Sequence, residues 1–272
     1  MKSIATIILP VLLVLVVSCN YKSDHPQAGL LKDQTATGMN EVSIRRFVDS
    51  LDLYIPTYNK QYSLIYTLGD HSLYVERYAA SPTNKVYYER NTDGASNSTL
   101  KKYYFKNDSL VLVEISSKQN VENATVLTES RIYLRNNTLF KKESRSASST
   151  AAIRSKPYLA VQTPENPANE ENYLENIKVL DDAIQQRNKF DLVFDNITTY
   201  PDARYLTLKS KDQNSYKANV LIDEKSAFID SLLSNPSIFK DEKLKFKWKI
   251  RNNEAVYVPE SATVTSASGL NK

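Results

Sequence analysis

The chain has 272 residues, of which 41% are hydrophobic and 24% are charged, with a formal net charge of +4 at pH 7. These proportions are ordinary for a globular chain that buries a core, and the weak positive charge gives no indication of a nucleic-acid partner. Only five glycines occur, which excludes the glycine-rich loops that cradle phosphates in P-loop and dinucleotide-binding proteins. Eighteen tyrosines favour pleated, half-buried sheet surfaces.

The first nineteen residues carry the most specific motif of the chain. Lys2 precedes an apolar stretch, residues 4–17, which is too short to span a bilayer core of about 30 Å. Ser18 then stands before Cys19, the only cysteine, and the residues before it do not form the small-residue cleavage site of a plain secretory signal. The pattern resembles the lipobox of bacterial lipoprotein precursors.

This resemblance implies a cellular location and a lipid anchor. Residues 1–18 would be a cleaved signal peptide, and Cys19 would carry acyl chains such as palmitate that hold the protein to a membrane. Asn20 stands where aspartate retains enteric lipoproteins in the inner membrane, so the resemblance implies the outer membrane of the cell envelope. Residues 19–39 are polar and aperiodic, which predicts a flexible tether.

A helix and a series of antiparallel strands are predicted after the tether. Asn40 is a suitable N-cap, and Pro56 is expected to end the helix. The apolar stripe between them has helical spacing and consists of Ile44, Phe47, Val48 and Leu51. Residues 62–146 then follow period two, which predicts strands, with the first over residues 62–68. Together, residues 40–150 are predicted to form an antiparallel β-meander domain with a flanking helix.

Two hairpin loops in this domain share one pattern. Asn107–Asp108 and Asn136–Asn137 each lie between a basic residue and a hydroxyl residue, and asparagine tolerates the positive φ that a two-residue loop requires. These loops predict four cross-strand pairs: Phe105 with Leu110, Tyr103 with Leu112, Leu134 with Leu139, and Tyr133 with Phe140.

A change in composition marks the second half of the chain. Residues 151–169, rich in Ser, Ala and Pro, are predicted to be a linker. Residues 170–265 predict a smaller β/α module, with elements over residues 170–187 (helix), 192–198, 205–209 and 216–223 (strands), 226–234 (helix), and 243–251 and 255–259 (strands). After the first helix this is the element order of an OB-like barrel, and a two-layer α+β sandwich fits nearly as well. Residues 266–272 are expected to be a disordered tail. The predicted fold class is α+β and β-rich.

The strand over residues 243–251 alternates strictly between cationic and apolar side chains. One face carries Lys243, Lys245, Lys247, Lys249 and Arg251. This cationic row is either a candidate site for an anionic ligand or partner, or a solvated face that prevents edge-to-edge strand pairing. Both interpretations stay open.

The apolar face of the same strand is predicted to be buried. With Asn252–Asn253 as the turn, Ile250 faces Ala255 and Trp248 faces Tyr257. Trp248 is then expected to pack near Phe228 and Leu232 of the short helix.

Groups that could carry out catalysis are few. His25 lies in the tether, and His71 follows Asp70 in a predicted turn, where both residue types are common. No nucleophile motif or metal-ligand spacing is found in the sequence, so no cofactor and no metal are expected. A glycosidase needs two carboxylates that can be far apart in sequence, and nothing marks such a pair.

The sequence thus predicts a non-catalytic envelope lipoprotein that acts as a binding or scaffolding component. A membrane would be its first partner, through Cys19, and an envelope protein or a glycan its second. Two alternatives stay open: a carboxylate-dependent glycan hydrolase, and an inhibitor or immunity-type protein.

Overall fold

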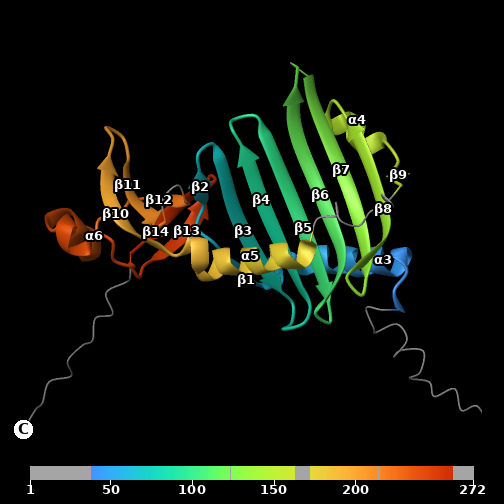
Figure 1. The fold of residues 1–272 in the computed structure, drawn as a ribbon, viewed down its shortest axis with the longest axis horizontal. Helices are drawn as coiled ribbons and strands as arrows, with labels where there is room; N and C mark the ends of the chain where they lie inside the picture. Colours follow the sequence, from blue (N-terminus) through green and yellow to red (C-terminus); the bar gives the residue numbers. More distant parts are fainter. Residues whose placement is uncertain (1–37, 123, 163–171, 213–214, 260–272) are drawn as a thin grey trace, which may run out of the picture.

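The computed structural model describes residues 38–122, 124–162, 172–212 and 215–259. The predicted signal peptide, Cys19, the predicted tether up to residue 37 and the tail lie outside these residues. The tether was predicted to extend to residue 39, but Met39 is buried in the core under the first helix. Fourteen strands form one sheet that runs through the whole described part of the molecule (Figure 1). This sheet and its flanking helices confirm the predicted β-rich α+β class.

The first eight strands form the predicted meander, in which each strand from β3 to β8 pairs with the next. Their bounds are β1 Asn59–Tyr62, β2 Tyr66–Leu68, β3 His71–Ala79, β4 Lys85–Asp93, β5 Asn97–Lys106, β6 Ser109–Val121, β7 Ala124–Arg135 and β8 Thr138–Ala147. Both β1 and β2 pair with β3, so the strand predicted over residues 62–68 is in fact two strands, separated at residues 63–65.

The remaining strands extend the sheet on both sides. They are β9 Leu159–Ala160, β10 Leu192–Thr199, β11 Arg204–Ser210, β12 Lys217–Leu221, β13 Lys247–Arg251 and β14 Glu254–Val258. β12 pairs with β2, with Lys217 opposite Thr67 and Ala218 opposite Tyr66, so both halves of the chain share the sheet. The predicted order of elements in the second half is confirmed. Its strands stay in an open sheet rather than an OB-like barrel, because β10 pairs only with β11 and β13 only with β14.

Five α-helices lie within the described residues. They are α3 Glu41–Tyr54, α4 Thr150–Ser155, α5 Tyr173–Gln185, α6 Ala227–Ser234 and α7 Pro236–Phe239. α4 and β9 lie within or next to residues 151–169, so the described part of the predicted linker is structured. α5 begins later than predicted, because the side chain of Asn172 caps it by accepting from the backbone N–H of Glu175 at 3.3 Å.

The front face of the sheet is the one that α5 crosses (Figure 1). On α5, Ile177, Leu180 and Ala183 share a buried core with side chains of the meander such as Tyr87 and Tyr103. The same core continues beneath β10, β11 and β12, and alternate residues of β11 and β12 are buried in it. One apolar layer therefore runs along the front of both halves of the chain.

The back face is covered in part by α3, which crosses behind the meander (Figure 1). Asn40 caps this helix as predicted, accepting from the backbone N–H of Ser43 at 2.9 Å. Its apolar stripe packs on a second buried core, in which Val86 and Tyr104 belong to the sheet. α3 reaches only part of the back face, and the rest of this face holds the candidate site.

The predicted hairpin loops are confirmed, with positive φ at Asn107, Asp108, Asn136 and Asn137. The pairs next to the loops, Phe105 with Leu110 and Leu134 with Leu139, are also as predicted.

The next pairs were predicted wrongly, because each hairpin contains a β-bulge with an extra residue, Val111 or Phe140. Tyr103 therefore faces Val113, and Tyr133 faces Lys141. In the first hairpin the bulge lets two consecutive apolar residues, Val111 and Leu112, both enter the core under α3.

Candidate binding groove on the back face

Back-face side chains form rows that run across the strands, because the pairing from β3 to β7 is continuous away from the bulges. Under α3 lies a buried apolar row of Val86, Tyr104, Leu112 and Tyr133. Next comes the charged row, which consists of Glu76, Tyr88, Lys102, Glu114, Arg131 and Glu143. Beyond it lies the groove row of Tyr74, Arg90, Leu100, Ser116, Glu129 and Arg145. The outermost is the hydroxyl row of Thr67, Ser72, Thr92 and Ser98.

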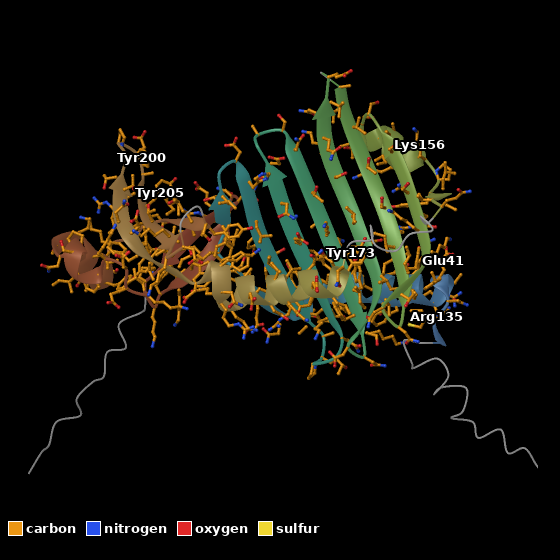
Figure 2. All side chains as sticks on the ribbon, in the orientation of Figure 1. Glu41, Arg135, Lys156, Tyr173, Tyr200 and Tyr205 are labelled. Atoms are coloured by element: carbon orange, nitrogen blue, oxygen red, sulfur yellow. The ribbon has the colours of Figure 1, made fainter. Side chains whose placement is uncertain are left out.

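The charged row is an internally neutralised boundary between α3 and the open surface. Glu143 is only 6% exposed and accepts from Lys141 at 3.0 Å and from the Tyr133 hydroxyl at 3.0 Å. Burial alone would raise the pKa of Glu143, but the hydrogen bonds from Lys141 and Tyr133 outweigh it and lower the pKa. Lys141 also pairs with Glu41 of α3 at 2.5 Å. Figure 2 labels Glu41, which lies close to Arg135. These charges hold the helix on the sheet.

The other end of the charged row is paired in the same way. Glu76, which is 6% exposed, forms ion pairs with Lys60 at 2.5 Å and with Arg90 at 3.6 Å. The Tyr74 hydroxyl donates to the same carboxylate at 3.1 Å, and burial raises the pKa of Tyr74. Since these buried charges have partners within the protein, the charged row stabilises the fold. Few of its charged side chains are available to bind a ligand.

A groove of about 470 Å³ lies over the groove row and the hydroxyl row. Thr150 and Ile153 of α4 line one side, and Ile250, Asn253 and Ile65 line the other. The floor and rim come from β3 to β7: Ser72, Tyr74, Arg90, Asn91, Thr92, Ser98, Thr99, Leu100, Ser116, Ser117, Lys118, Leu127, Thr128 and Glu129. This volume lies within the range of about 300–1,000 Å³ that is typical of ligand pockets.

Glu129 is the only carboxylate among the residues that line this groove. Arg145 donates to its Oε2 atom at 2.8 and 2.6 Å, and the Tyr158 hydroxyl donates to the same atom at 2.9 Å. Burial opposes ionisation, but the hydrogen bonds from Arg145 and Tyr158 outweigh it and lower the pKa of Glu129. Glu129 is thus held in its ionised form, and Arg145 balances its charge.

Tyr158 also fixes the chain that walls the groove. The centroid of its ring lies 4.0 Å from the guanidinium carbon of Arg131 and 4.3 Å from that of Arg145. Arg145 further donates to the backbone carbonyl of Lys156 at 3.0 Å. These contacts hold the segment after α4 against the back face.

A second hollow, of about 750 Å³, adjoins the groove over β10, β11 and β12. The two hollows share Ile65 and Asn253. The second hollow is lined by Ile65, Thr67, Thr198, Tyr200, Ala203, Tyr205, Thr207, Lys217, Asn219, Asn253, Glu254 and Ala255. Figure 2 shows Tyr200 and Tyr205 close together on the β10–β11 hairpin, with ring centroids 6.0 Å apart. The Tyr205 hydroxyl donates to Glu254 at 3.1 Å.

The predicted cationic row keeps its alternation but does not line either hollow. Lys243, Lys245, Lys247, Lys249 and Arg251 are all exposed, and the strand itself begins only at Lys247. Two of the cations have partners: Arg251 pairs with Asp223 at 2.7 Å, and Lys243 pairs with Asp191. Their role in binding stays a prediction.

The predicted turn and register of the last hairpin are confirmed, with Ile250 opposite Ala255 and Trp248 opposite Tyr257. Trp248 is only half-buried, and its indole N–H donates to the carbonyl of Ser63 at 3.2 Å.

The predicted aromatic contact of Trp248 needs correction. Phe228 of α6 stacks on Tyr257 at 5.9 Å, whereas Trp248 lies against Tyr62 and Phe246. One of these two neighbours, Tyr62, comes from β1, which the pattern of the last hairpin alone does not reveal.

His71 begins β3, directly after the turn of Gly69 and Asp70. Its Nδ1 atom lies 3.4 Å from the Asp93 carboxylate, and both side chains are more than half exposed, at 68% and 61%. Within the described residues, no group of three or more His, Cys, Asp or Glu side chains could hold a metal ion.

The groove could not be found from sequence patterns, since its residues come from six strands and a helix that are far apart in sequence. The available signal is the presence of serine and threonine at alternate positions of consecutive strands, but only the register turns these positions into a row.

None of the described helices has both the length and the apolar character that crossing a lipid bilayer requires. No protein-family model, curated protein or solved structure matches this chain.

Proposed function

We propose that this protein is a lipid-anchored, non-catalytic component of the outer membrane that binds an envelope partner in its back-face groove. The observation that carries the proposal is the groove itself. It is open, and its floor presents hydroxyls, the Tyr74 ring and the exposed Arg90 side by side. Such a mixture of aromatic and polar groups suits recognition of a protein or a glycan.

The state of Glu129 supports binding over the alternative of glycan hydrolysis. A glycosidase needs two carboxyl groups that flank the scissile bond, one of them an acid whose pKa is raised. Glu129 stands alone among the groove residues, and Arg145 and Tyr158 lower its pKa. A residue in this state is a poor general acid.

The proposed anchor is compatible with a fold that stands away from the bilayer. The first described helix begins at Glu41, twenty-two residues after Cys19. An extended chain of that length reaches at most roughly 70–80 Å. The groove could therefore meet a partner at some distance from the membrane surface.

The anchor is tested by replacing its lipid-bearing residue. Cys19→Ala should abolish incorporation of a palmitate analogue and leave the precursor unprocessed. Equal labelling of variant and wild type would contradict the lipoprotein assignment and, with it, the proposed location.

The groove is tested by filling it. The native lipidated protein is purified from solubilised membranes, together with Ser116→Trp, which places a large ring on the groove floor, and Ser237→Trp, an exposed control on α7. We expect an intact protein or glycan to co-purify with wild type and control but not with Ser116→Trp. Equal recovery from all three proteins would contradict the groove, and recovery of a cleaved glycan would favour the hydrolase.

A further inference from the structure

The hydroxyl row continues beyond the groove and links the two hollows. Lys217 of β12 faces Thr67, and at the other end Ser98 faces Lys118 of β6. Between these lysines, Thr67, Ser72, Thr92 and Ser98 follow in unbroken register on β2, β3, β4 and β5. Six neighbouring strands thus present four hydroxyls with a cation at each end.

The charges along this row are mostly positive and available. Lys118 and Lys217 are exposed, and neither makes an ion pair within the described part of the chain. Arg90, in the adjacent groove row, is also exposed, and its contact with Glu76 is long, at 3.6 Å.

Each of the three carboxylates near the row has a partner. Glu129 is held by Arg145, and Glu254 accepts from Tyr205. Asp93, which shares a hollow with Ser98 and Lys118, lies 3.4 Å from His71. The complementary ligand is therefore anionic.

The geometry favours a sugar polymer over a peptide. Strands lie about 4.8 Å apart, so the row from Lys217 to Lys118 crosses five gaps and spans roughly 24 Å. One gap is close to the length of a pyranose ring in an extended glycan.

A peptide strand, by contrast, binds a sheet through backbone hydrogen bonds at its edge. Along this row the backbone groups are committed to pairing between strands, so the surface offers side-chain hydroxyls. The Ser72 and Thr92 hydroxyls are hydrogen-bonded to each other at 2.6 Å, and the Thr67 hydroxyl donates to the Lys217 carbonyl at 3.4 Å. Each of these oxygens keeps lone pairs that can accept from a ligand hydroxyl.

We propose that the hydroxyl row binds an extended acidic polysaccharide that lies across the strands. Its carboxylates meet Lys118 and Lys217, its ring hydroxyls exchange hydrogen bonds with the serine and threonine side chains, and Tyr74 and Tyr205 flank its path. This assignment rests on the proposed function of the groove and names the ligand class.

The test measures binding of oligogalacturonate, an acidic probe long enough to cross the row, with a neutral cello-oligosaccharide of equal length as comparison. Titration calorimetry on the full mature chain at moderate salt gives Kd. We expect binding of the acidic probe and at least about tenfold weaker binding of the neutral one, since each tenfold in Kd corresponds to about 1.4 kcal/mol. Failure of the acidic probe to bind, or equal binding of both probes, would overturn the proposal.

Three variants with the same change of charge separate this row from other surfaces. Lys118→Glu/Lys217→Glu should weaken binding at least about tenfold, because it reverses both end cations. Lys178→Glu/Lys225→Glu, on exposed positions of α5 and of the segment before α6, should stay within about twofold of wild type. Lys245→Glu/Lys247→Glu tests the rival cationic row. If the first variant binds as wild type does, or if the rival or control variant loses as much affinity, the row is not the site.

A fourth variant removes hydroxyls without changing charge. Thr92→Val/Ser98→Ala should weaken binding several-fold while the circular dichroism spectrum stays that of wild type. Unchanged affinity would leave only a diffuse electrostatic attraction and overturn the assignment. If the acidic probe fails but Ser116→Trp still prevents capture of an envelope protein, the proposed function stands and only the ligand class falls.

Discussion

On strand β5, the side chain of Tyr104 lies under α3 and is fully buried, whereas Ser98, on the same face of the same strand, is exposed. The neighbouring strands show the same gradient, from large apolar residues under the helix to hydroxyls beyond it. A single sheet face is thus divided into a covered half that stabilises the fold and an open half that is free to bind. The comparison shows that the position of α3 determines which side chains on this face of the sheet are buried and which are exposed to solvent.

The charged row marks the border between the halves. Charges at such a border are partly desolvated, so each needs an opposite partner to be tolerated. Glu143 with Lys141 and Glu76 with Lys60 meet this need at the two ends. The open half, in contrast, keeps Lys118 and Lys217 exposed.

The largest effect on stability is expected from removing a large buried side chain in the covered half. Tyr104→Ala should lower the free energy of unfolding by about 3–5 kcal/mol, the usual loss for a large buried aromatic side chain. Ser98→Ala, on the open half of the same strand, should change it by no more than about 0.5 kcal/mol. Urea unfolding followed by circular dichroism measures both, and similar losses would contradict the division of this face.

A loop at the covered end of the strands sharpens the comparison. Asn136 and Asn137 both have positive φ, at 50° and 62°. Replacing the pair with Val-Val should cost about 2–4 kcal/mol, because the left-handed conformation costs roughly 1–2 kcal/mol for an ordinary residue, whereas asparagine, like glycine, adopts it readily. Gly-Gly at the same positions is the control and should be close to wild type in urea unfolding. A Val-Val variant as stable as Gly-Gly would show that this loop tolerates another conformation.

At the border between the halves, we expect the contribution of Glu143 to stability to depend on pH. Glu143→Gln should lower stability at pH 7 by about 1–3 kcal/mol, because Lys141 and Tyr133 lose their charged acceptor. The pKa of Glu143 is lowered from its ordinary 4.5, so the wild-type advantage is present above that pH and is lost as the pH falls through the folded-state pKa.

Urea unfolding near pH 7 and near pH 3 should therefore show a difference between the two proteins that shrinks in acid. Glu224→Gln, an exposed control, should differ from wild type by no more than about 0.5 kcal/mol at either pH. A Glu143→Gln difference that persists or grows in acid would contradict the ion-pair origin.

The smallest effect is expected on the open half. Lys118→Glu/Lys217→Glu should change the free energy of unfolding by less than about 1 kcal/mol, since exposed charges contribute little to stability. The same holds for Lys245→Glu/Lys247→Glu, just before and at the start of β13. A thermal unfolding midpoint that falls by many degrees in the first variant would indicate that the hydroxyl row has a structural role.

Local sequence was sufficient to predict much of the fold. The side chain of Asn40 starts α3, and the Asn-Asx pairs form the loops, because capping and positive φ depend on a few neighbouring atoms. The register of the last hairpin was also predictable, since a two-residue loop fixes the adjacent pair and no bulge interrupts the pairing of β13 with β14.

Tertiary packing decided what local patterns could not. The bulges at Val111 and Phe140 shift the register of two hairpins, and the first brings consecutive apolar residues into the core under α3. The pairing of β12 with β2 joins residues about 150 positions apart in sequence, which no local period encodes. The hydroxyl row depends on both continuous pairing and the reach of α3. Each of its serines and threonines looks like an ordinary strand residue, and only the sheet places them side by side.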